Sequence, residues 1–169
     1  EELEAAALMP AEQVGLEFEP ALLGQLISDV GNQPGALPLF QYALTELFDR
    51  RSGDVLMAST YRSMGGVDGA LLRRAEELFE QLSDQEQEAA RQLFLRLLTV
   101  TEHDHRSRRR VTAREVVSLA VDNVTMHDVI RRFGDHRLLS FDSDPFTGAP
   151  TVEVAHESLL TAWPTLEGW

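Results

Sequence analysis

The stretch "RLLSFDSDPFTGAPTVEVAHESLLTAW", residues 137–163, decides the fold that we predict for this chain. Two short runs, 137–142 and 151–155, carry the composition and alternation of strands with one buried face. Asp, Pro and Gly residues lie between the runs and indicate a turn. A helical pattern begins after His156. The sequence therefore predicts a two-stranded hairpin followed by a final helix.

Three predicted helices precede this hairpin. Ser83–Glu86 and Thr112–Glu115 are capping boxes, in which a Ser or Thr is followed in the first turn by Glu. A helix with apolar residues at helical spacing follows each box, and a third helix spans about 125–134. The charged segment 101–110, "TEHDHRSRRR", is expected to be a loop. This order predicts a winged helix-turn-helix over 83–169, with a small wing sheet of two to three strands.

The first half of the chain has the pattern of several short helices. Apolar stripes at helical spacing run through 22–30, 37–48 and 71–82, and glycines break the chain between them. We therefore predict a mainly α protein, in which a helical bundle domain over 1–82 is followed by the winged-helix domain over 83–169. The predicted boundary lies near Gln81–Ser83.

The composition excludes several classes of function. The chain has 28 acidic and 15 basic residues and a net charge of -13, which argues against general nucleic-acid binding, because neutralised phosphates supply most of that affinity. Every basic residue is an arginine, so the lysine of a P-loop or of a Schiff base is missing. Without cysteine there is no disulfide, thiolate nucleophile or cysteine-ligated zinc.

The hydropathy and the first residues add three expectations. No apolar run reaches the roughly 18 residues of a membrane span, and no signal-peptide pattern opens the chain. We therefore expect no membrane association and a cytoplasmic location. The chain starts "EELEAAAL", without methionine, so we expect it to be part of a longer protein.

A winged helix can bind DNA by placing the second helix of its turn in the major groove. The arginines available for this role are Arg131, Arg132 and Arg137. Four carboxylates of the helix and the wing would then face the DNA phosphates: Asp128, Asp135, Asp142 and Asp144. We therefore expect the winged helix to be a packing module, with DNA binding as the alternative.

The predicted loop holds two weaker candidate sites. A phosphate-binding patch could form from Arg106, Arg108, Arg109 and Arg110. A metal ion could be held by His103, Asp104 and His105. Histidines in a charged loop are usually solvated, so we expect no metal here.

The segment "QPGALPL", residues 33–39, combines a glycine with a predicted helix start. Gly35 allows close approach of the backbone, and Pro38 suits the first turn of a helix, where its missing N–H is no loss. A helix N-terminus suits an anion or a nucleotide. An ordinary loop-to-helix transition has the same pattern.

His156 lies between the second predicted strand and the final helix, where the backbone holds it rigidly. An imidazole can donate to a phosphate at neutral pH, particularly when a nearby anion raises its pKa. A single histidine at such a place is more often structural. A second histidine segment, "TMHD" at 125–128, fits a helix start in which Thr125 caps and Asp128 favours the positive helix end.

Taken together, several segments closely resemble the bacterial novel STAND NTPase family, relatives of the AAA+ and NACHT-type signalling ATPases. They are "GNQPGALPLFQYALTEL", "YRSMGGVDGALLRRAEELF", "RQLFLRLLT", "RRRV", "RLLSFD" and "VEVAHESLLTAWPTLEGW", in the expected order. The resemblance covers nearly the whole chain. It implies the helical lid and the winged helix that follow the P-loop core in this family, without the core itself.

The resemblance implies nucleotide contacts for two segments. In STAND proteins a Gly-x-Pro element lies over the adenine, and "GALPL" resembles it. Here two residues, Ala36 and Leu37, separate Gly35 from Pro38, one more than in the family pattern. In related proteins the histidine of a Met-His-Asp motif contacts the β-phosphate of ADP. The matching position here is Ala155-His156-Glu157, after the last wing strand, rather than the literal "MHD" at 126–128.

The function implied by the resemblance is a signalling switch that closes over ADP or ATP in the intact protein. The missing core would hold Mg²⁺, so we expect no cofactor and no ATP hydrolysis in this segment alone. Expected partners are the protein's own N-terminal P-loop domain and flanking effector, DNA-binding or WD-type repeat domains, with an oligomer on activation. The alternatives are a DNA-binding transcription regulator and a pure protein-interaction module.

Overall fold

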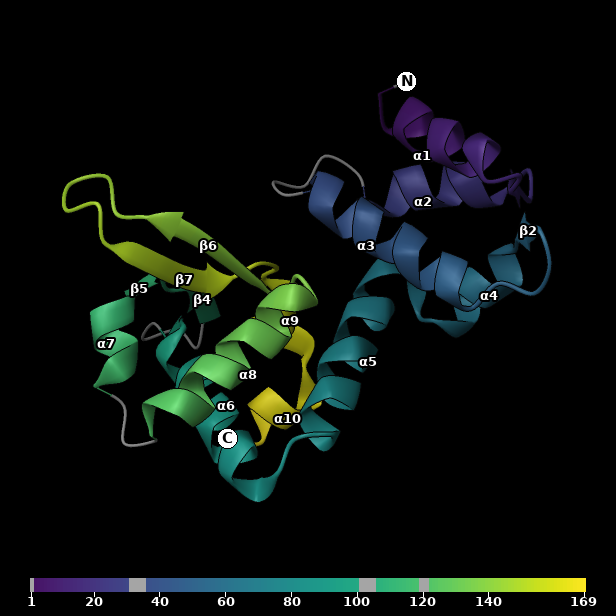
Figure 1. The fold of residues 1–169 in the computed structure, drawn as a ribbon. Helices are drawn as coiled ribbons and strands as arrows, with labels where there is room; N and C mark the ends of the chain where they lie inside the picture. Colours follow the sequence, from purple (N-terminus) through teal and green to yellow (C-terminus); the bar gives the residue numbers. More distant parts are fainter. Residues whose placement is uncertain (1, 31–35, 101–105, 119–121) are drawn as a thin grey trace. The chain divides into compact units, whose positions relative to one another are not determined.

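The computed structural model describes residues 2–30, 36–100, 106–118 and 122–169 (Figure 1). The chain divides into two compact units, Glu1–Leu71 and Leu72–Trp169. This division falls inside a helix, α5 (Gly66–Glu80), whereas the predicted boundary near Gln81–Ser83 follows the end of that helix. In the part of the chain that the structure describes, no helix is both long and apolar enough to cross a membrane.

The first unit is helical, with one short pair of strands (Figure 1). Its elements are α1 (Glu2–Gln13), β1 (Glu17–Phe18), α2 (Leu22–Val30), α3 (Ala36–Asp49), β2 (Val55–Leu56), α4 (Ala58–Ser63) and the first part of α5. The strands β1 and β2 pair in parallel. The helices predicted over 22–30, 37–48 and 71–82 are confirmed as α2, α3 and α5.

Two long-range hydrogen bonds to carboxylates hold α4 in the first unit. The backbone N–H of Ala58, at the start of α4, donates to Oε2 of Glu19 at 2.7 Å. The hydroxyl of the buried Tyr61 donates to Oδ2 of Asp29 in α2 at 2.8 Å. Burial and the adjacent Asp29 raise the pKa of Tyr61 well above its ordinary value, so the phenol remains a donor. α4 is therefore fixed to α2 and to Glu19, the residue that follows β1.

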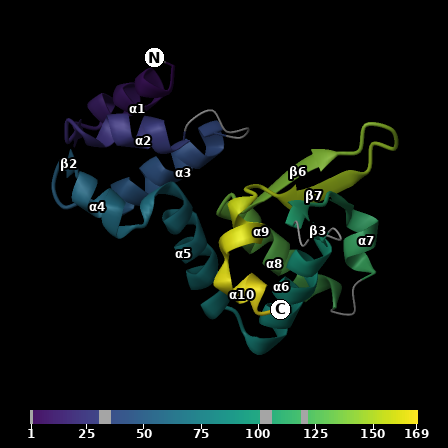
Figure 2. The same cartoon turned by 180° about the vertical axis from the view of Figure 1, so that it is seen from behind.

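The described residues of the second unit form mainly helices, together with an antiparallel hairpin (Figure 2). They are α6 (Asp84–Arg96), α7 (Ala113–Val117), α8 (Asn123–Asp135), β6 (Leu139–Ser143), β7 (Pro150–Val154), α9 (Ser158–Ala162) and α10 (Pro164–Glu167). β6 and β7 are antiparallel, and β5 (Val111–Thr112) extends the sheet in the order β5-β7-β6. The two predicted strands and the final helix are thus confirmed.

The capping signals explain where these helices begin. Ser83 forms the predicted capping box with Glu86 at the start of α6. α8 begins earlier than predicted, because Asp122 rather than Thr125 is its cap. The Asp122 carboxylate accepts hydrogen bonds at 3.0 Å from the backbone N–H groups of Val124 and Thr125. An ionised aspartate both accepts several bonds and interacts favourably with the positive helix end, so it displaces the threonine from this role.

The prediction of a loop over 101–110 is wrong for residues 106–108, which form a strand, whereas Arg109 and Arg110 lie outside any helix or strand. β4 (Arg106–Arg108) pairs antiparallel with β3 (Leu98–Val100). The run Arg-Ser-Arg has no apolar alternation to indicate a strand. Backbone pairing and the contacts of the arginine side chains, rather than burial of apolar groups, stabilise β4.

Trp163 lies at the centre of the second unit's core and is fully buried. Its ring contacts Phe79 of α5, Phe94 of α6 and Phe133 of α8, at centroid distances of 6.1, 5.1 and 6.4 Å. The indole N–H donates to Oε2 of Glu76 in α5 at 2.6 Å. These contacts fasten the C-terminal segment of the chain to three helices.

We predict that Trp163→Ala lowers the free energy of unfolding by about 3–5 kcal/mol, because it leaves a large cavity among aromatic side chains. Trp169→Ala is the matched control, since Trp169 also contacts Phe79 and Trp163 but is partly exposed. Its loss should be much smaller. Urea unfolding followed by circular dichroism measures both variants, and equal losses would contradict the central place of Trp163.

Candidate functional site

His156 lies in the short link between β7 and α9. The N–H of Ala155 donates to the carbonyl of Leu138 at 3.0 Å, and the N–H of Leu159 donates to the carbonyl of His156 at 3.2 Å. His156 is only 7% exposed, and its Nε2 is buried. The imidazole is therefore largely enclosed in this conformation.

Two arginines of β4 contact the backbone on either side of His156. Nη1 of Arg108 donates to the carbonyl of Ala155 at 3.4 Å, and Nη1 of Arg106 donates to the carbonyl of Leu160 at 3.3 Å. These arginines are two residues apart, so both side chains leave the same face of the strand, the face against which α9 packs. The sequence did not connect these arginines with His156, because they fell in a segment predicted to be a loop.

The next two arginines of the same segment, Arg109 and Arg110, form ion pairs. Nη2 of Arg109 lies 2.6 Å from Oε1 of Glu115, which also accepts from Arg96 at 2.7 Å. The guanidinium of Arg110 lies 3.1 Å from both Asp142 and Glu153. The four arginines considered as one phosphate-binding patch therefore have separate surroundings.

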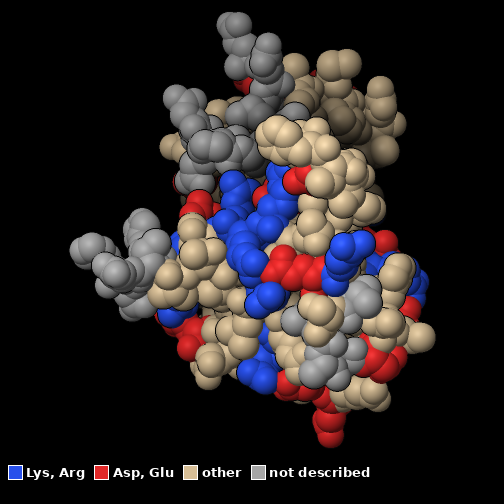
Figure 3. Space-filling view, turned by 90° about the vertical axis from the view of Figure 1, so that its left-hand side faces the viewer, with Lys and Arg blue, Asp and Glu red and all other residues tan. Residues whose placement is uncertain are grey.

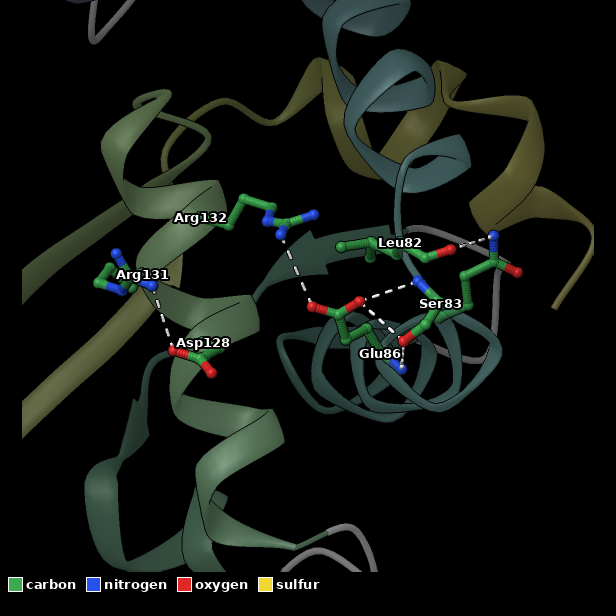
Figure 4. Close-up of polar contacts among 7 residues, drawn as sticks. Leu82, Ser83, Glu86, Asp128, Arg131 and Arg132 are labelled. Carbon is green, nitrogen blue, oxygen red and sulfur yellow. Dashed lines mark hydrogen bonds and ion pairs between the residues drawn. The ribbon is translucent and has the colours of Figure 1, made fainter.

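The arginines considered for DNA binding are also engaged within the second unit. Nη2 of Arg131 lies 3.2 Å from Asp128 on the same helix, and Nη2 of Arg132 lies 3.7 Å from Glu86 of α6 (Figure 4). Hydrogen bonds from the capping residue lower the pKa of Glu86, so this carboxyl is ionised at neutral pH. Arg137 follows α8 at a φ of 56°, the left-handed conformation that often ends a helix.

In the turn between β6 and β7, the carboxylate of Asp144 accepts hydrogen bonds from the turn's own backbone. Oδ1 of Asp144 accepts from the backbone N–H groups of Thr147 at 2.7 Å and Phe146 at 3.0 Å. These bonds, with a further one from the Thr147 hydroxyl, lower the pKa of Asp144. The tip of the turn exposes Phe146 almost fully, at 96%. A carboxylate and an apolar ring are therefore what the wing tip presents.

An apolar groove lies between α7, α8 and the sheet. Its volume is about 160 Å³, and its lining includes Val116, Met126, Ile130, Phe141 and Val152. Elsewhere on the surface, the face in Figure 3 shows arginines in a band that is interrupted by carboxylates. The side of α8 that faces the hairpin thus offers apolar contacts, and much of the exposed positive charge has carboxylates beside it.

The remaining predicted site residues belong to other parts of the chain. Leu37 and Pro38 lie in the first turn of α3, in the first unit, and Gly35 lies outside the described residues. The residues considered for a metal ion, 103–105, also lie outside them. Within the described residues there is no group of three or more His, Asp or Glu side chains that could hold a metal ion.

Comparison with known proteins supports the resemblance seen in the sequence. The model of the family described as Novel STAND NTPase 1 matches residues 1–169, the whole chain. No curated protein and no solved structure matches the chain. The match covers both units and therefore applies to the segments around Pro38 and His156 alike.

We predict that the chain does not bind duplex DNA, because the arginines of α8 are paired with carboxylates and the net charge is -13. Fluorescence anisotropy with a labelled duplex at low salt should show no complex. The double variant Arg131→Ala, Arg132→Ala should behave in the same way. A complex that weakens steeply with added salt, and that the double variant loses, would contradict this prediction.

Proposed function

Because the chain belongs to the novel STAND NTPase 1 family, we propose that it is the regulatory part of a STAND-type signalling NTPase. In this proposal residues 1–82 are the helical lid and residues 83–169 are a winged helix. Both act on a P-loop domain elsewhere in the intact protein and couple its nucleotide state to partner domains. The observation that carries the proposal is the position of His156, held between β7 and α9.

The order of elements in the second unit supports the winged-helix assignment. α6, α7 and α8 precede the antiparallel pair β6 and β7, and β5 completes a sheet of three strands. In a winged helix the second helix of the turn corresponds to α8 and the hairpin to the wing. His156 then follows the last strand of the wing, which is the position of the Met-His-Asp histidine in related proteins.

The literal "MHD" at 126–128 has contacts that suit packing instead. Met126 is buried in the core, and His127 lines the apolar groove. Asp128 pairs with Arg131. The segment Ala155-His156-Glu157 is therefore our choice for the nucleotide-sensing motif, although Ala and Glu replace the Met and Asp of the family pattern.

The surroundings of His156 are compatible with a phosphate ligand. Backbone hydrogen bonds hold the segment that carries the imidazole; the Arg108 guanidinium bonds the Ala155 carbonyl in this link, and the Arg106 guanidinium bonds a carbonyl of α9. A nucleoside diphosphate would supply the negative charge that these groups bind. We propose that Gly35, together with Leu37 and Pro38 in the first turn of α3, contacts the base of that nucleotide.

A switch follows from differential affinity. If His156 meets the phosphates of ADP only when the winged helix is docked, ADP stabilises the docked state by that difference in binding free energy. Exchange for ATP would then release the winged helix toward effector or repeat domains, or toward an oligomer. Since the chain has no lysine, the phosphate-binding lysine of the P-loop and the Mg²⁺ site belong to the core domain.

A protein-interaction module without nucleotide sensing is the second candidate. The apolar groove between α7, α8 and the sheet favours it, because an exposed apolar groove of this kind suits a partner's side chains. The nucleotide content of the purified full-length protein, and its response to ADP, distinguish the two candidate functions. A pure interaction module would behave identically with and without bound ADP.

We predict that His156→Ala in the full-length protein lowers ADP affinity about 10-fold or more, because it removes a hydrogen bond to a charged phosphate. The matched control is His127→Ala, which alters the literal motif and should retain ADP as the unmodified protein does. The measurements are the ADP content of the purified proteins and the rate of ADP release. If both variants retain ADP equally well, His156 has a structural role and the proposed nucleotide sensing is wrong.

A further inference from the structure

Arg108 differs from the neighbouring arginines because it has no carboxylate partner among the described residues. Within the described residues, Arg109 pairs with Glu115, Arg110 pairs with two carboxylates, and Arg106 lies 3.8 Å from Glu167. Arg108 forms no ion pair among these residues, and its guanidinium is exposed. Its hydrogen bond to the Ala155 carbonyl, at 3.4 Å, is long and therefore weak.

The backbone of Arg108 is nevertheless held firmly beside the His156 link. Arg108 is opposite Leu98 in the β3–β4 pair, and the N–H of the next residue, Arg109, donates to the Leu97 carbonyl at 2.7 Å. The Arg109–Glu115 ion pair also holds the residue that directly follows Arg108. The guanidinium therefore lies beside the link and forms no ion pair with a carboxylate of the described residues.

His156 alone offers too little to a diphosphate. The imidazole is largely buried, and even a fully accessible imidazole has at most two N–H donors. A diphosphate carries several negative charges and many acceptor oxygens, and it needs more than one donor to be neutralised. A guanidinium has five N–H donors in a planar fork that fits phosphate oxygens in pairs.

We propose that Arg108 is a second phosphate-binding residue, which acts together with His156 on the terminal phosphate groups of a nucleoside diphosphate. This inference rests on the proposed nucleotide-sensing function and adds a residue to that site. When the phosphates are present, the guanidinium exchanges its weak bond with the Ala155 carbonyl for charge-assisted bonds. When they leave, it returns to the carbonyl, so the link keeps its conformation.

The test compares Arg108→Gln with Arg114→Gln in the full-length protein. Arg114, on α7, is also exposed and forms no ion pair among the described residues, so its loss changes the net charge equally. We expect Arg108→Gln to weaken ADP binding about 10-fold to 100-fold and Arg114→Gln to leave it unchanged. Adenosine, which lacks phosphates, should bind both variants as it binds the unmodified protein, and thermal unfolding should not shift.

The outcomes separate this inference from the function on which it rests. If Arg108→Gln binds ADP normally while His156→Ala does not, Arg108 has no phosphate role and the proposed function stands. If neither variant affects ADP, both proposals are wrong. If Arg108→Gln weakens adenosine and ADP alike, or lowers the unfolding temperature, Arg108 is a structural residue and the inference is overturned.

Discussion

The second unit depends on the hydrogen bond between the indole N–H of Trp163 and the carboxylate of Glu76, at 2.6 Å. A buried indole requires a polar partner, and α5 supplies it. The same ring fills the space between Phe94 and Phe133, so a single side chain from the C-terminal segment joins three helices. Because α9 lies directly before Trp163, these contacts also hold the link that contains His156.

Charge pairing decides which cations remain for a ligand. The chain is strongly acidic, and carboxylates bind most of the arginines that the sequence groups into one basic segment. Arg110 joins the two wing strands through Asp142 and Glu153. Arg108 is left with a backbone carbonyl, beside His156. The proposed phosphate contacts therefore come from two side chains, Arg108 and His156, in segments far apart in the sequence.

Local sequence signals predicted much of this structure. The capping box at Ser83 was sufficient to predict the start of α6, and the alternating runs were sufficient to predict β6 and β7, because each signal depends only on neighbouring residues. β4 was missed because it is stabilised by pairing with β3 and by arginine contacts with the carbonyls of Ala155 and Leu160, which no local pattern reports. Asp122 was missed as a cap because Thr125 has the same local signal. The position of His156 was predictable, whereas its arginine neighbours required the fold.

The central claim is that the segment around His156 responds to the nucleotide bound elsewhere in the protein. Hydrogen–deuterium exchange of the full-length protein, measured in a peptide that covers residues 151–163, tests it most directly. We predict slower exchange in this peptide with ADP than with a non-hydrolysable ATP analogue, because in the proposed switch only ADP keeps the winged helix docked. Identical exchange in the two states would contradict the claim.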